Sequence, residues 1–190
     1  MFGQLSVGEV KNLGVVDANI TGSGPLIGGL VGYNWGDVTQ CYSTGAVSGK
    51  DRVGGLVGAN DGENGRGTLA QCYSTGAVSG GSDVGGLVGW NVNYAVTQCY
   101  STGAVSGGSN VGGLVGANDG TVTACFWDIQ TSGQLISAGG TGKTTAEMQK
   151  ASTVLDAGWD FVGETKNGTE DIWWILEGKD YPRLWWEARN

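Results

Sequence analysis

The chain has 190 residues, including 38 glycines and no histidine, and its formal net charge is −8 at pH 7. This acidic balance argues against a nucleic-acid-binding protein, because contacts to phosphates require clustered Lys and Arg. The lack of histidine excludes Ser-His-Asp and Cys-His catalysis and His-ligated zinc. Hydrophobic residues still make up 39% of the chain, and eight residues are Trp, so the chain is too apolar for a disordered glycine-rich linker.

No apolar run approaches the roughly 18 residues that a membrane-spanning helix needs. We therefore expect no membrane insertion. The first residues also lack the basic and then apolar pattern of a secretion signal. Either the export information lies outside this sequence, or the protein does not use that route.

The N-terminal segment is a degenerate copy of a repeat unit that recurs further along the chain. In the clear copies, Gly-Gly-Leu-Val-Gly begins at Gly28, Gly54, Gly85 and Gly112. Gln-Cys-Tyr-Ser-Thr-Gly-Ala-Val-Ser-Gly begins at Gln40, Gln71 and Gln98, and a decayed copy begins at Ala124. Residues 10–16 align with the Cys-containing part of the unit, and residues 18–22 align with its Ala-Val-Ser-Gly part.

The unit has a length of about 26 residues, which is typical of stacked repeat architectures. One longer interval indicates a polar insertion near residues 63–67. No unit has enough apolar side chains to bury a core alone, so the units must stack on one another. We predict an all-β fold, a β-solenoid or β-helix of about four to five rungs, over residues 1–127.

Each unit is expected to form three short strands separated by turns. The strands are Val-Gly-Gly-Leu-Val-Gly, Val-Thr-Gln-Cys-Tyr-Ser-Thr and Ala-Val-Ser-Gly. Asn-x-Gly sequences, such as residues 34–36 and 118–120, mark the turns because Asn and Gly accept positive φ at little cost. Stacking at the ~4.8 Å spacing of β-strands then places each side chain over its equivalent in the next unit.

This stacking predicts columns of identical side chains. One inward column contains Leu30, Leu56, Leu87 and Leu114, and a second contains Cys41, Cys72, Cys99 and Cys125. Tyr42, Tyr73, Tyr100 and Phe126 follow the cysteines and should point the opposite way, forming an aromatic stripe. Val38 and its equivalents also have an inward character but lie three residues before the cysteines, so a bend or bulge must separate the two positions.

The four cysteines allow more than one interpretation, and the pattern favours buried free thiols. Zinc sites use closely spaced Cys pairs, which this sequence lacks, so we expect no metal ion. Disulfides between Cys41 and Cys72 and between Cys99 and Cys125 remain an alternative. In-register parallel positions suit the geometry of that bond poorly.

Residues 128–190 no longer follow the repeat and are expected to form a small cap packed on the last rung. Thr144 and Glu147 have the spacing of a capping box, and residues at helical spacing follow until Gly158, which predicts one short helix. The tail then becomes rich in aromatic residues, each able to bury roughly 150–250 Å². Four of its tryptophans are Trp173, Trp174, Trp185 and Trp186.

The repeats resemble the GLUG motif, named for its Gly-Leu-any-Gly core. Gly-Gly-Leu-Val-Gly-x-Asn and Cys-Tyr-Ser-Thr-Gly-x-Val match it, and residues 137–148, 159–161 and 180–184 are similar to a segment that often closes such arrays. The resemblance implies a β-solenoid from extracellular, adhesin-like surface proteins of bacteria and archaea. It brings no catalytic residues to this chain.

Four other patterns fit structural roles better than ligand sites. Residues 137–144 approach a phosphate-binding loop, but no parallel strand precedes them and no Walker B acid follows. Acidic residues at turns lack the calcium-binding β-roll pattern, and no carboxylate pair recurs on a strand face as polysaccharide-cleaving enzymes require. The threonine column is too close to bulky tyrosines to order ice. We therefore expect no catalytic residues and no cofactor.

The composition and repeats favour a non-enzymatic structural module that is extracellular or on the cell surface. We expect it to self-assemble through end-to-end and cap contacts into a filament or surface layer, because exposed strand edges and Trp residues are typical of interfaces. Its partners would be other copies or flanking surface-protein domains. The alternative is an adhesin that binds glycans or host proteins through Tyr42, Tyr73 and Tyr100 or through the exposed Trp residues.

Overall fold

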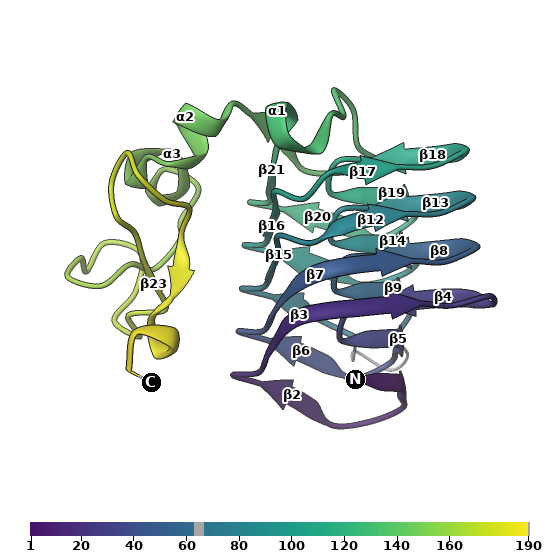
Figure 1. Ribbon diagram of the computed structural model, residues 1–190. Helices are drawn as coiled ribbons and strands as arrows, with labels where there is room; N and C mark the ends of the chain where they lie inside the picture. Colours follow the sequence, from purple (N-terminus) through teal and green to yellow (C-terminus); the bar gives the residue numbers. More distant parts are fainter. Residues whose placement is uncertain (63–66, 190) are drawn as a thin grey trace.

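The computed structural model describes residues 1–62 and 67–189, so residues 63–66 of the expected insertion lie outside the described residues. The chain is an all-β solenoid of about five turns with a few short helices, which confirms the predicted fold class. Figure 1 shows the short strands stacked in layers and the C-terminal segment standing beside them.

Four parallel sheets, named A to D, form the sides of the solenoid. Sheet A contains β1 (Phe2–Leu5), β5 (Val31–Asn34), β9 (Val57–Asn60), β14 (Val88–Asn91) and β19 (Val115–Asn118). Sheet B contains β2 (Glu9–Lys11), β6 (Asp37–Thr39), β10 (Leu69–Ala70), β15 (Ala95–Thr97) and β20 (Thr121–Thr123). Each strand pairs in register with its equivalent in the next rung, so Val31 lies beside Val57.

Sheets C and D complete each rung. Sheet C contains β3 (Gly14–Thr21), β7 (Tyr42–Ser48), β11 (Tyr73–Ser74), β12 (Ala77–Ser79), β16 (Tyr100–Ser101), β17 (Val105–Ser106), β21 (Phe126–Asp128) and β22 (Thr141–Lys143). Sheet D contains β4 (Pro25–Gly28), β8 (Asp51–Gly54), β13 (Ser82–Gly85) and β18 (Ser109–Gly112). The degenerate first unit follows the same path, because Val10 pairs with Val38 and Ile20 with Val47.

The corner between sheets B and C is a bend with left-handed backbone. Its residues are Gln40, Gln71, Gln98 and Ala124, with φ of 51°, 55°, 51° and 52°. The bend resets the alternation of side chains, so both Val38 and Cys41 are buried in the core. This is the bend that the spacing of these two residues requires. Further breaks between sheets D and A divide the unit, so the three strands expected per unit are four or five shorter ones.

Glycine is required where sheet D turns into sheet A. A Cβ on Gly54 would lie against the carbonyl oxygen of Val57, and a Cβ on Gly85 would lie against that of Val88. Backbone atoms cannot move aside as a flexible side chain can, so a larger residue would push the strands apart. The close approach of the two strands explains the Gly-Gly-Leu-Val-Gly sequence.

The solenoid contains two apolar cores. The main core includes the leucine column, the cysteine column and Val31, Val38, Val57, Leu69, Val88, Val96 and Val115. All four leucines of the column, Leu30, Leu56, Leu87 and Leu114, are fully buried. The second, named the valine core, lies between sheets C and D and contains Val47, Val53, Val78, Val84 and Val105, packed against Ile20, Ile27 and Val111.

Asparagine side chains form a buried ladder along sheet A. Asn34 Nδ2 donates to Asn60 Oδ1 at 2.8 Å, and Asn60 Nδ2 donates to Asn91 Oδ1 at 2.9 Å. Asn91 in turn donates to Asn118 at 2.8 Å. The sequence pattern identified these residues only as turn formers, whereas each amide also satisfies its neighbour's buried polar atoms.

The C-terminal segment differs from the expectation in its position. Residues after α1 (Ile129–Ser132) lie over the last rung, but the chain then returns along the outside of sheet C (Figure 1). The predicted cap was placed on the last rung alone. The returning part contains α2 (Thr145–Met148), α3 (Ala151–Leu155), the antiparallel pair β23 (Trp173–Trp174) and β24 (Arg183–Leu184), and the 3-10 helix η1 (Trp185–Arg189).

The single predicted helix is divided in two. Thr144 and Glu147 form the expected capping box at the start of α2. Lys150 then adopts an extended backbone, with φ of −110° and ψ of 126°, which separates α2 from α3. Among the described residues, no helix is long and apolar enough to cross a membrane.

Replacing Leu87 with alanine should lower the free energy of unfolding by about 2–5 kcal/mol, because it leaves a cavity in the fully buried leucine column. Leu176→Ala is the matched control, because that side chain is 53% exposed and its loss should change stability by less than about 0.5 kcal/mol. Urea unfolding followed by circular dichroism measures both. Equal effects of the two substitutions would contradict the buried column.

Candidate functional site: the aromatic column and the ends of the solenoid

The outer side of sheet C carries the aromatic column, defined as Tyr42, Tyr73, Tyr100 and Phe126. In-register pairing of β7, β11, β16 and β21 places these residues over one another. The rings of Tyr42 and Tyr73 are stacked with centroids 5.0 Å apart, and those of Tyr73 and Tyr100 are also stacked at 5.0 Å. Regular stacking of strands thus produces a continuous aromatic surface that points away from the main core.

The C-terminal segment covers this surface, so the aromatic column is not the exposed stripe that we expected. The ring of Trp173 lies 6.4 Å from that of Tyr73 and 6.1 Å from that of Tyr100, and Trp159 packs 6.0 Å from Phe126. Tyr73, Tyr100 and Trp173 are each 0% exposed. They therefore offer no contact surface in this structure. Burying large aromatic area against the solenoid explains why the chain returns along sheet C.

The returning part of the C-terminal segment, residues 145–189, is named the cover. It provides hydrogen-bond partners for the buried hydroxyl groups of the aromatic column. Tyr100 Oη donates to the carbonyl oxygen of Pro182 at 2.6 Å, and Tyr73 Oη donates to the carboxylate of Glu187 at 2.9 Å. Burial raises the pKa of both tyrosines above the ordinary value, and it also raises the pKa of Glu187. No sequence motif points to Glu187, because its partner lies on a strand more than a hundred residues away.

A second polar contact joins the cover to Asp128 in the last rung of the solenoid. Tyr181 Oη donates to Asp128 Oδ2 at 2.6 Å, and Asp128 also accepts the backbone N–H of Gln130 as the N-cap of α1. Burial and this hydrogen bond raise the pKa of Tyr181 to about 12. Asp128 therefore joins the end of the solenoid to the returning segment.

The cysteines are free and buried in the main core. Backbone N–H groups donate along the column, from Cys41 to the Cys72 Sγ at 3.4 Å and from Cys72 to the Cys99 Sγ at 3.3 Å. Burial raises the pKa of Cys72, Cys99 and Cys125 well above the ordinary value. This arrangement fits inert structural thiols. No group of three or more metal-binding side chains occurs within the described ranges 1–62 and 67–189.

A groove separates the first rungs from the end of the C-terminal segment. It has a volume of about 220 Å³ and is lined by Lys11, Asn12, Gln40, Glu170, Asp171, Ile172, Trp185 and Trp186. Trp186 Nε1 donates to the carbonyl oxygen of Gln40 at 3.0 Å, which fixes the ring at the groove. Trp185 and Trp186 are half-buried, as is Trp174, so these three of the four named tail tryptophans keep partial exposure.

The C-terminal end of the solenoid is covered by residues 134–140. The hydroxyl oxygen of Ser137 accepts the backbone N–H groups of Leu114 and Val115 at 3.3 and 2.9 Å. It thereby replaces a leucine carbonyl oxygen, because Leu114 O accepts the equivalent N–H groups of Leu87 and Val88 one rung earlier. The sequence placed Ser137 in a segment resembling a phosphate-binding loop. The structure instead gives it the role of closing the last rung.

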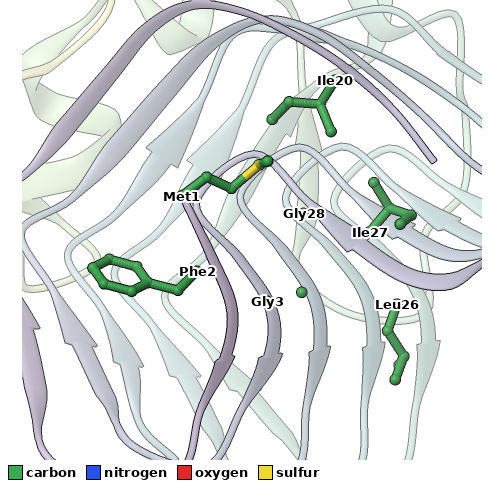
Figure 2. A pocket seen from close by; sticks show the side chains of 8 residues that line it. Met1, Phe2, Gly3, Ile20, Leu26, Ile27 and Gly28 are labelled. Atoms are coloured by element: carbon green, nitrogen blue, oxygen red, sulfur yellow. The ribbon is translucent and has the colours of Figure 1, made fainter.

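The N-terminal end is open by comparison. β1, β2, β3 and β4 are edge strands, with no further strand paired to them in the described parts of the chain. The end pocket, named here for its position, is lined by Met1, Phe2, Gly3, Ile20, Leu26, Ile27, Gly28 and Gly32. Figure 2 shows the side chains of Met1, Ile20 and Ile27 around it. Five exposed apolar side chains lie in the first rung: Met1, Phe2, Val7, Leu13 and Val16.

The repeats are matched by a family model. The GLUG motif matches residues 23–48 and 80–106, which confirms the resemblance on two repeats of the chain. The matches cover β4 to β7 and β13 to β17, so the motif corresponds to one rung of the solenoid.

Two curated relatives are similar to the chain. A protein named as a Gly-rich membrane protein from Evansella cellulosilytica is 40% identical over 163 residues, covering 84% of this chain and 12% of the relative. Halomucin from Haloquadratum walsbyi is 49% identical over 53 residues, covering 28% of this chain and 1% of that protein. The chain thus spans only a small part of the length of these relatives. No solved structure matches it.

Raising the pH through about 12 should release the C-terminal segment from the aromatic column. The raised pKa of Tyr181, about 12, means that its neutral form is favoured by folding. Its contribution to stability is complete below the ordinary pKa near 10 and is lost as the pH rises through the folded value. Tryptophan emission and tyrosinate absorbance should change together in this window.

Tyr181→Phe provides the control, because it removes the hydroxyl group whose pKa is about 12 and leaves Tyr73 and Tyr100, whose pKa values burial also raises, in place. Release should then move to higher pH. If all tyrosines titrate near pH 10 without any change in tryptophan emission, the C-terminal segment does not bury the tyrosines of the aromatic column.

Proposed function

We propose that this chain is a non-enzymatic structural module of an extracellular or cell-surface protein and that it self-associates through the ends of its solenoid. Support comes from the GLUG repeats and from the names of the relatives, one of which is described as a membrane protein. Further support comes from the sites themselves. Within the described residues, the titratable groups of the solenoid core are buried thiols, a set that suits packing better than catalysis.

The open N-terminal end is the observation that carries the proposal. Met1, Val7 and Val16 are 72%, 70% and 61% exposed there, next to the edges of four strands that pair with no further strand of the described chain. Exposed edges of parallel sheets readily pair with other chains unless they are covered. In the cap, Trp159 and Trp173 are fully buried against the solenoid and Trp174, Trp185 and Trp186 are half-buried, so we assign the contacts to the ends and not to the cap. The partner is a second copy or a flanking domain of the same surface protein.

Purified protein should form larger species as its concentration rises, and added salt should favour them. Copies with a net charge of −8 repel one another, and salt screens this repulsion while leaving apolar contacts intact. Sedimentation velocity across a concentration and salt series measures the effect, and electron microscopy shows whether the species are elongated. Dispersed monomers under every condition would contradict the proposal.

A second function, glycan binding, is favoured by the groove beside Trp185 and Trp186. Aromatic rings next to carboxylates and amides are suited to sugars, because the rings stack on apolar sugar faces and the polar groups bind hydroxyls. Glu170, Asp171 and Gln40 provide such groups in the groove. This surface replaces the buried tyrosines as the site of the adhesin alternative.

Retention on polysaccharides in affinity electrophoresis, following a glycan array, tests this second function. Trp185→Ala should reduce retention, because it removes a ring that lines the groove. Trp90→Ala is the control, since Trp90 is also half-buried but lies on sheet A, under Arg52 and away from the groove. Equal retention of both variants and the unaltered protein would exclude the groove as a binding site.

A further inference from the structure

The end pocket lies where one side of the first rung has no strand. Sheet A has five strands, beginning with β1, whereas sheet D has four and ends at β4. The position beyond β4 is therefore unfilled in the described chain, next to β1. Ile20 and Ile27, which continue the valine core toward this end, line the pocket there. The pocket is thus the uncovered end of the valine core.

The same side of the solenoid carries an exposed apolar segment at its other end. Gly86 N donates to the carbonyl oxygen of Gly112 at 3.3 Å, and Gly113 N donates to that of Ile136 at 3.0 Å. Ile136 therefore occupies the register position that follows Gly112 in sheet D. Figure 1 shows the segment after α1 rising above the last rungs.

The aliphatic side chains of Leu135 and Ile136 are highly exposed, and no contact among the described residues of one copy accounts for their apolar character. Their exposed fractions are 81% and 72%, and neither side chain belongs to an apolar core of the described chain. The segment itself is held in place, because Gln134 Nε2 donates to the carbonyl oxygen of Val105 at 2.8 Å. Two exposed aliphatic side chains on a fixed segment form a rigid apolar projection.

We propose that Leu135 and Ile136 of one copy insert into the end pocket of a second copy. This inference rests on the self-association proposed above and names its contact. Both surfaces lie at the sheet D side, at opposite ends, so a translation along the solenoid axis brings them together. The segment then fills the position beyond β4, and the valine core continues from one copy into the next.

The contact joins two different surfaces, so it leaves a free pocket at one end of each pair and a free projection at the other. Such heterologous contacts extend into open filaments when the rotation between copies does not close a ring. The geometry therefore predicts a polar filament in which every copy has the same orientation. Pairing of two N-terminal ends would instead stop at a dimer.

Disulfide trapping between two variants, each with one added cysteine, tests the contact directly. Gly3→Cys places a thiol in the end pocket, where an added Cβ meets no atom within 4 Å, and Leu135→Cys places one on the projection. A mixture of the two should give a heterodimer under mild oxidation. Gly3→Cys mixed with Leu176→Cys is the control and should give none, because Leu176 lies on the cover. The native cysteines are buried and should not compete.

The double substitution Leu135→Asp and Ile136→Asp separates this inference from the proposed function. Both side chains are exposed, so circular dichroism and the unfolding midpoint should stay unchanged. The concentration needed for self-association should rise by at least about tenfold, because the apolar contact is lost and like charges are added. Leu176→Asp should leave association unchanged.

The outcomes are distinguishable. If the unaltered protein associates and the double variant associates equally well, or if Gly3→Cys forms homodimers and no heterodimer with Leu135→Cys, then the proposed contact is wrong and self-association stands. If the unaltered protein does not associate at all, both the contact and the proposed function are wrong. Loss of association in the double variant together with specific trapping supports the contact.

Discussion

In-register parallel pairing is the constraint on which the rest of this structure depends. Because each strand lies beside its own equivalent in the next rung, every side-chain position recurs along the axis of the solenoid. Leucines fill a narrow core, asparagine amides satisfy one another, and tyrosine rings stack at 5.0 Å. A small unit with too few apolar residues to fold alone thereby gains a continuous interior.

The same repetition gives the solenoid two unlike ends. At one end, Ser137 accepts backbone N–H groups of the last rung, and at the other, no described residue covers the edges of β1 and β4 or the apolar pocket beside them. The first rung has no sheet D strand in the described chain, and Ile136 occupies the sheet D register position beyond the last rung. This relation supports both the proposed self-association and the specific contact inferred for it.

The sequence predicted the repeated features well and the unique ones poorly. The solenoid, the bend between Val38 and Cys41 and the capping box of Thr144 all follow from local spacing, which physical chemistry restricts strongly. The fate of the tyrosines did not follow, because exposure depends on which distant segment packs on them. Trp173 and Glu187 lie on a non-repeating segment, and nothing in its local pattern indicates where it docks. The structure therefore agrees with the predicted fold but not with the predicted contact surface, because Tyr73 and Tyr100 are buried.

The path of the C-terminal segment has a consequence for how the molecule comes apart. Solenoids are commonly able to fray rung by rung from an end, since each rung touches only its neighbours. Here the cover contacts Phe126 in the last rung, Tyr73 and Tyr100 in the middle, and Gln40 near the first. Because one segment packs along several rungs, the loss of one rung also weakens the contacts of that segment with the others. We therefore expect the rungs to unfold together, as a globular domain does, and not one at a time.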